Sequence, residues 1–115
     1  MWGYEKKLQY PVNITKSDPK AAKVIISQLG GPDGEMAAAL RYLSQRYTMP
    51  WPEIKALLTD IGTEELAHVE IISAILYQLT DGVSIEALKD AGMDTYFVDH
   101  TLGIYPSSAA GVPFS

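Results

Sequence analysis

The chain has 115 residues and no cysteine, with 47% hydrophobic residues, 20% charged residues and a formal net charge of −5. This length and composition fit one globular domain with a modest core, and they exclude disulfides, thiolate metal sites and cysteine nucleophiles. The acidic pI of about 4.8 argues against a nucleic-acid partner. No apolar run is long enough for a membrane span, and the first residues lack the apolar run of a signal peptide. We therefore expect a protein that stays inside the cell.

The first part of the chain predicts an extended arm followed by a bent helix. Residues 1–17 alternate apolar and polar side chains, and Pro11 opposes a helix there. A helix is predicted over 18–47, because Pro19 suits the first helical position after a Ser or Asp cap. Glycines around Gly31 interrupt this pattern, so the helix should bend at that point.

The rest of the chain predicts one long helix, one short helix and a tail. The long helix should cover 52–79, about 40 Å at 1.5 Å per residue. A short helix is expected over 84–91, with Gly92 just past its end. Residues 92–115 show no clear periodicity and are interpreted as an ordered loop or a tail. The whole chain is thus read as a single domain.

A heptad pattern runs along the predicted long helix and includes two polar residues. Its members follow steps of 4 and 3: Ile54, Leu58, Ile61, Glu65, His68, Ile72, Ile75 and Leu79. Such a pattern is typical of a helix packed in a bundle, so Glu65 and His68 should both point inward. A buried carboxylate needs a positive partner, and no Lys or Arg lies within a turn of Glu65. A divalent metal ion is the simplest such partner.

The preceding helix carries a second inward carboxylate. Glu35, Ala39 and Tyr42 share a stripe at helical spacing, and two antiparallel helices would bring Glu35 close to Glu65 and His68. A Glu followed by Glu-x-x-His on the next helix is half of the ligand set of ferritin-like carboxylate proteins. Oxygen and nitrogen ligands without sulfur suit manganese or iron. The predicted fold class is therefore all-α, a ferritin-like helical hairpin that forms half of a four-helix bundle.

Each of these residues also has a structural explanation. The Glu-x-x-His pair alone is a weak signal, and a hydrogen-bonded buried Glu–His pair is the alternative to a metal site. Tyr42 is either a core aromatic or a donor to a ligand carboxylate. Glu64 and Glu70 lie off the heptad pattern and are expected in solvent, and His100 is expected to be a loop residue.

The segments KLQYPV, GGPDGE, RYLSQRY, LLTDIGTEELAHVEII and VDHTLGIYP resemble the manganese catalase family, in particular its spore-coat branch. The resemblance implies a four-helix bundle that holds two manganese ions and dismutates hydrogen peroxide. It further implies that Glu35 is a terminal carboxylate ligand, that Glu65 bridges both metals and acts in catalysis, and that His68 is a nitrogen ligand. Tyr42 would donate a hydrogen bond beside Glu35.

The resemblance covers only the N-terminal half of that family, whose members continue with a second helix pair supplying another Glu and another His. Either the chain is a half-length protein that pairs with itself, or it is a fragment of a longer protein. We favour a homodimer or higher oligomer, because the long apolar face needs a cover and a two-fold axis duplicates every ligand.

Two functions follow from the sequence. The first is a dinuclear manganese site, with iron as the alternative metal, that dismutates hydrogen peroxide between two chains. The second is a structural spore-coat or assembly protein whose metal site holds the dimer together. The expected location is the cytoplasm or the spore coat.

Overall fold

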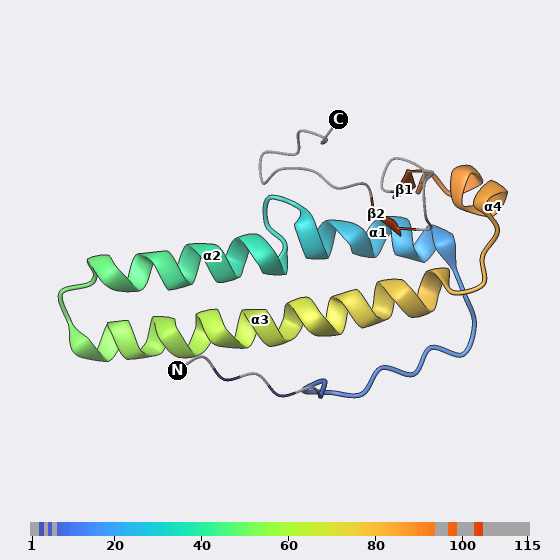
Figure 1. Cartoon of the computed structure of the whole chain (residues 1–115). Coiled ribbons are helices and arrows are strands. Elements are labelled where there is room, and N and C mark those ends of the chain that lie inside the picture. Colours follow the sequence, from blue (N-terminus) through green and yellow to red (C-terminus); the bar gives the residue numbers. More distant parts are fainter. Residues whose placement is uncertain (1–2, 4, 6, 94–96, 99–102, 105–115) are drawn as a thin grey trace.

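The computed structural model describes residues 3, 5, 7–93, 97–98 and 103–104 and has two layers of helices (Figure 1). Its elements are α1 (Pro19–Gly30), α2 (Glu35–Gln45), the 3₁₀ helix η1 (Arg46–Thr48), α3 (Pro52–Thr80), α4 (Ile85–Asp90), β1 (Phe97–Val98) and β2 (Gly103–Ile104). Helices α1 and α2 follow one another along one side of α3, and the two short strands pair antiparallel. The described part of the chain is thus mainly a helical hairpin.

The first layer consists of two helices rather than one bent helix. Helix α1 starts at Pro19, where Asp18 Oδ1 accepts a hydrogen bond from the Ala21 N–H (3.1 Å). It ends at Gly30, and the following N–H of Gly31 donates to the Ser27 carbonyl (3.0 Å). Four residues of turn then precede α2, so the glycines interrupt the helical hydrogen bonds completely instead of only bending the axis.

Helix α3 forms the second layer. Its 29 residues span about 43 Å, from a proline at its first position to Thr80. Gly82, two residues later, has a φ of +72°, a conformation that glycine adopts without strain. None of the described helices is both long and apolar enough to cross a membrane.

The N-terminal arm runs along α3 on the side away from α1 and α2 (Figure 1). The Gln78 side chain holds the arm at two points, because its Oε1 accepts from the Ile14 N–H and its Nε2 donates to the Val12 carbonyl, both at 2.7 Å. Gln9 Nε2 donates to Glu64 Oε2 at 2.7 Å. The Gln78 side-chain amide therefore attaches the arm to α3 and forms the backbone hydrogen bonds that a neighbouring strand would otherwise form.

Four of the five buried apolar residues in the described part of the chain gather where α1 packs against the second half of α3. This core consists of Ala22, Leu76, Leu79 and Met93. Residues of the arm, α1, α3 and α4 pack around it and are partly buried. Packing between α1 and α3 thus fixes the position of α1 relative to the helix that carries Glu65 and His68.

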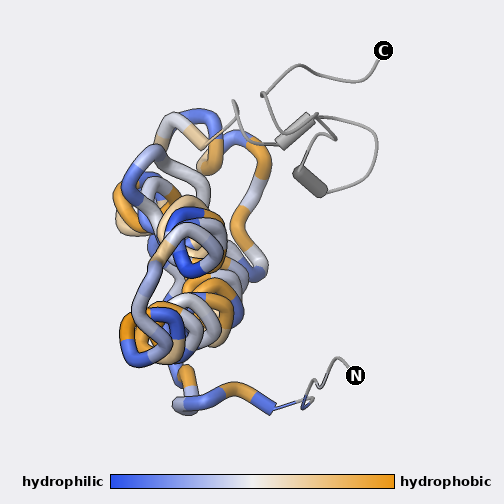
Figure 2. The backbone as a smooth tube through the Cα atoms, turned by 90° about the vertical axis from the view of Figure 1, so that its left-hand side faces the viewer, coloured by the Kyte–Doolittle hydropathy of each residue, from blue (hydrophilic) through white to orange (hydrophobic). Residues whose placement is uncertain are grey.

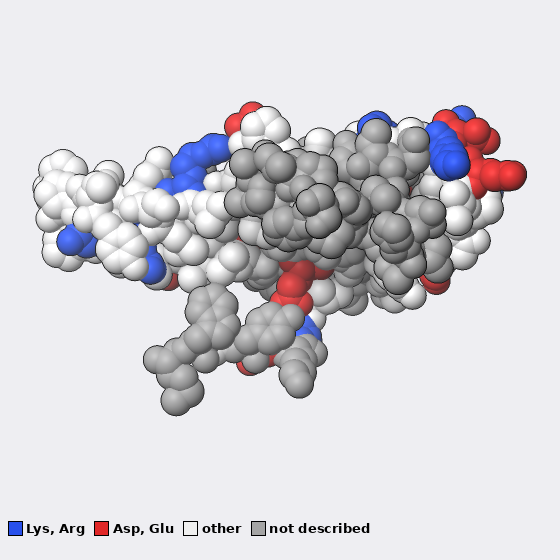
Figure 3. Space-filling model, turned by 45° about the horizontal axis from the view of Figure 1, so that its top comes forward, with Lys and Arg blue, Asp and Glu red and all other residues white. Residues whose placement is uncertain are grey.

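The opposite end of the hairpin, where α2 meets the start of α3, is open. Leu40 is 64% exposed, Tyr47 75% and Leu57 52%. Figure 2 looks onto this end and shows hydrophobic segments on the outside of the helices as well as between them. Figure 3 shows that most of the surface there is uncharged. The Cα radius of gyration of 16.5 Å exceeds the roughly 13 Å of a compact domain of this length.

The heptad pattern of α3 is therefore only partly inside the protein. Leu79 is buried, the middle of the pattern is half-buried, and Ile54 is exposed. This incomplete burial agrees with the expectation that the long apolar face needs a cover from outside the hairpin. Helices α1 and α2 cover one side of α3, and among the described residues no further helix covers the rest of the pattern.

Candidate metal centre

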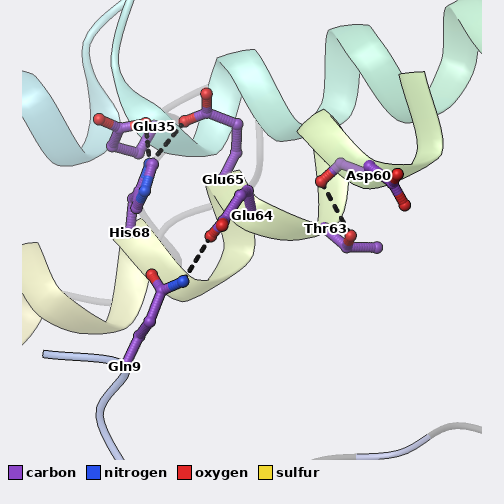
Figure 4. A network of polar contacts seen from close by, with 7 residues as sticks. All are labelled: Gln9, Glu35, Asp60, Thr63, Glu64, Glu65 and His68. Atoms are coloured by element: carbon purple, nitrogen blue, oxygen red, sulfur yellow. Dashed lines mark hydrogen bonds and ion pairs between the residues drawn. The ribbon is translucent and has the colours of Figure 1, made fainter. Parts of the chain in front are cut away.

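Three predicted ligands meet in the middle of the hairpin. Glu35 opens α2, while Glu65 and His68 lie one turn apart on α3, and the three side chains point toward one another (Figure 4). His68 Nδ1 lies 3.3 Å from Glu65 Oε2 and 3.6 Å from Glu35 Oε2. The structure therefore brings together two carboxylates and one imidazole from residues up to 33 positions apart (35 to 68).

The site is sheltered but not closed. The side chains of Glu65, Glu35 and His68 are 17%, 26% and 38% exposed. Among the described residues, the only ion-pair contacts of the two carboxylates are with His68. Two partly buried carboxylates without a Lys or Arg partner repel each other, and this repulsion favours binding of a cation.

The donor set fits a transition-metal ion. One ligand atom from each residue can be chosen so that all three lie within 4.8 Å of one another. Ions of this class bind oxygen and nitrogen at about 2.1 Å, so ligand atoms on opposite sides of an ion lie about 4.2 Å apart. Small side-chain rotations close that difference. Oxygen and imidazole donors without sulfur suit manganese or iron, as the sequence predicts.

Helix α2 also places Glu35 favourably for binding a cation. It is the first residue of the helix and the acidic residue of its first turn. The partial positive charge at a helix N-terminus stabilises a carboxylate at this position in its ionised form.

Among the described residues, the others singled out in the sequence do not belong to this group of three. Tyr42 is half-buried on the same side of α2 as Glu35, but its hydroxyl makes no hydrogen bond with any described residue. Glu64 is exposed and turns away from the site toward Gln9 (Figure 4). Glu70 is half-buried. His100 lies outside the described residues.

Sequence reasoning missed a glycine that sets the distance between the two helices. Gly62 is buried on α3, one turn before Glu65. A Cβ at this position would lie 2.7 Å from the Leu43 side chain of α2 and 3.3 Å from the Leu43 backbone nitrogen, so a larger residue would require the Leu43 side chain to move. A glycine in the middle of a long helix was the available signal, since it is unfavourable there without a packing reason.

The whole chain, residues 1–115, matches the family described as "Manganese containing catalase". The chain belongs to this family. It is 53% identical over 115 residues to Protein CotJC of Bacillus subtilis (strain 168), covering 100% of this chain and 60% of that protein. It is 33% identical over 128 residues to a manganese catalase of Bacillus subtilis, covering 100% of this chain and 47% of that protein.

A solved structure gives the same relation in three dimensions. The crystal structure of wild-type KatB, a manganese catalase from Anabaena, superposes with a TM-score of 0.78 at 29% identity, covering 100% of this chain and 51% of that chain. The predicted membership of the family is confirmed, and so is the all-α fold of its ferritin-like members over half their length. The chain spans about half of the length of these catalases.

Proposed function

We propose that this protein is a manganese catalase-like enzyme that dismutates hydrogen peroxide at a dinuclear site. The observation that supports this most directly is the convergence of Glu35, Glu65 and His68 at the middle of the α2–α3 hairpin. Manganese, with iron as the alternative metal, supplies the redox chemistry when bound. Glu35 and Glu65 would hold the metal through carboxylate oxygens, and His68 would hold it through a ring nitrogen.

The residues of the chain have separate tasks in this reaction. Dismutation turns two hydrogen peroxide molecules into two water molecules and one oxygen molecule, so two protons leave the peroxide that is oxidised and two join the peroxide that is reduced. We assign Glu65 to hold a proton between the half-reactions. Its carboxylate is the less exposed of the two and lies 3.3 Å from His68 Nδ1, which fixes its orientation.

The site needs more ligands than one chain supplies among its described residues. We propose that a second copy of the chain supplies them, as a homodimer or a larger oligomer. A two-fold axis beside the site would bring two copies of Glu35, Glu65 and His68 together, giving four carboxylates and two imidazoles. The exposed apolar residues at the hairpin end support this arrangement, because Leu40, Tyr47 and Leu57 gain a cover on association.

A structural role is the second candidate. The His68 side chain is 38% exposed, so groups of a second chain can reach it, and a metal ion bound by both chains would hold them together. In this role the protein would be a component of the spore coat or of another assembly. We propose that the protein resides in the cytoplasm or the spore coat, and fractionation of sporulating cells with an antibody against the chain tests both locations.

Peroxide turnover separates the two candidates. The protein loaded with Mn²⁺ is mixed with hydrogen peroxide, and oxygen release is followed with an oxygen electrode. Release that disappears in Glu65→Gln and persists in Glu64→Gln supports the enzyme. A manganese-dependent increase in the melting temperature without oxygen release supports the structural role, and the absence of manganese binding contradicts both.

A further inference from the structure

Glu35 has no helical residue before it, so its position depends on the turn between α1 and α2. Gly34 is the N-cap residue of α2 and is buried. It has no side chain that could accept a hydrogen bond from the first turn of the helix. Its backbone is extended (φ −79°, ψ 178°), a conformation open to every residue type. If this position requires glycine, the cause must therefore be a steric clash of a Cβ atom and not the backbone dihedral angles.

The space at Gly34 is closed by backbone atoms of α1. A Cβ at Gly34 would lie 2.8 Å from the carbonyl oxygens of both Ser27 and Gln28. Ordinary carbon–oxygen contacts begin at about 3.3 Å, so the chain at Gly34 would have to withdraw by about 0.5 Å. These oxygens belong to the last turn of a helix and cannot rotate aside as a side chain can.

The turn transmits such a shift to the site. The Gly34 N–H donates to the Gly31 carbonyl (3.0 Å), and the Gly34 carbonyl accepts from the Ala38 N–H in the first turn of α2 (2.9 Å). Helix α1 is itself fixed on α3 through Ala22, which packs in one cluster with Leu76 and Leu79. Through Gly34, the start of α2 is thus held against α1, which is packed on the helix that carries Glu65 and His68.

We propose that Gly34 is a positioning residue that holds the Glu35 carboxylate at its distance from His68 and Glu65. The use of that position for metal binding rests on the proposed function. A displacement of about 0.5 Å equals the tolerance of a metal or catalytic constellation, so a single added methyl group is enough to disturb the site.

The test compares Gly34→Ala with Gly30→Ala. Gly30 is the last residue of α1, and a Cβ there meets no atom within 4 Å, so the second variant makes the same chemical change without the contact. Nuclear Overhauser contacts between the Glu35 side chain and the His68 ring are measured in the metal-free proteins. Mn²⁺ titrations then measure the dissociation constant of each folded protein.

We expect Gly34→Ala to weaken the Glu35–His68 contact by at least half and to raise the Mn²⁺ dissociation constant at least tenfold, with both values unchanged in Gly30→Ala. If Gly34→Ala unfolds in buffer, the spectra are recorded in trimethylamine N-oxide, which favours the folded state. An unchanged contact, or a variant that stays unfolded with the osmolyte, overturns the proposal. A parent protein that binds no Mn²⁺ contradicts the proposed function, while the metal-free spectra still decide the role of Gly34.

Discussion

Replacing Glu65 by glutamine should change the stability of this protein in opposite directions with and without manganese. The ligand oxygens of Glu35 and Glu65 lie within 4.8 Å of each other. Two unit charges at this distance repel by about 0.9 kcal/mol in water and about 3.5 kcal/mol at an effective dielectric constant of 20. Because both side chains are partly exposed, the lower part of this range applies, about 1–2 kcal/mol.

The metal-free Glu65→Gln variant should therefore melt several degrees higher than the parent, at about 4 °C per kcal/mol. Manganese should stabilise the parent by about 2.7 kcal/mol at a concentration 100 times its dissociation constant, and the variant hardly at all. Melting is followed by circular dichroism at pH 8. Both proteins are measured with chelator and with Mn²⁺.

Glu64→Gln is the matched control, because it makes the same change at the next residue of α3, where the side chain is exposed and contacts Gln9. Its metal-induced stabilisation should equal that of the parent. The reasoning is refuted if Glu65→Gln keeps the full manganese-induced rise in melting temperature, or if Glu64→Gln loses it to the same extent.

Three further changes test the surroundings of the site. Gly62→Ala should destabilise the protein by up to about 2 kcal/mol, since crowding against Leu43 costs about 1–3 kcal/mol and removing a helical glycine returns about 1 kcal/mol; a higher melting temperature contradicts this. Gln78→Ala removes the acceptor of the Ile14 N–H, so hydrogen exchange of that amide should accelerate roughly tenfold or more, and exchange at the parent rate would show that the arm is held by other contacts. Tyr42→Phe should leave both the metal-free melting temperature and the Mn²⁺ dissociation constant unchanged, because the hydroxyl makes no hydrogen bond with any described residue, whereas a roughly tenfold weaker affinity in titrations would show that it donates to a ligand carboxylate in the metal-bound protein.

The meeting of Glu35, Glu65 and His68 could be predicted from the sequence because it depends on two robust regularities. The 3.6-residue period puts Glu65 and His68 on one side of α3, and the short connection before Pro52 makes α2 and α3 antiparallel neighbours. The proline signals likewise correspond to the observed first residues of α1 and α3.

The distances inside the hairpin could not be predicted in the same way. The close approaches at Gly34 and Gly62 depend on how near one helix lies to another, and this is decided by the packing of all their side chains. The sequence indicated that the apolar face needs a cover, but it could not say that Leu40 and Tyr47 would be among the exposed residues, because periodicity does not tell which apolar residues the neighbouring helix covers.

Native mass spectrometry of the untreated protein tests the central claim most directly, because it reports the number of subunits and the bound metal together. The account predicts a dimer, or a multiple of it, carrying two manganese or iron ions per pair of chains. A metal-free monomer that stays metal-free after incubation with Mn²⁺ would contradict the shared site, and with it the catalase-like function that we propose.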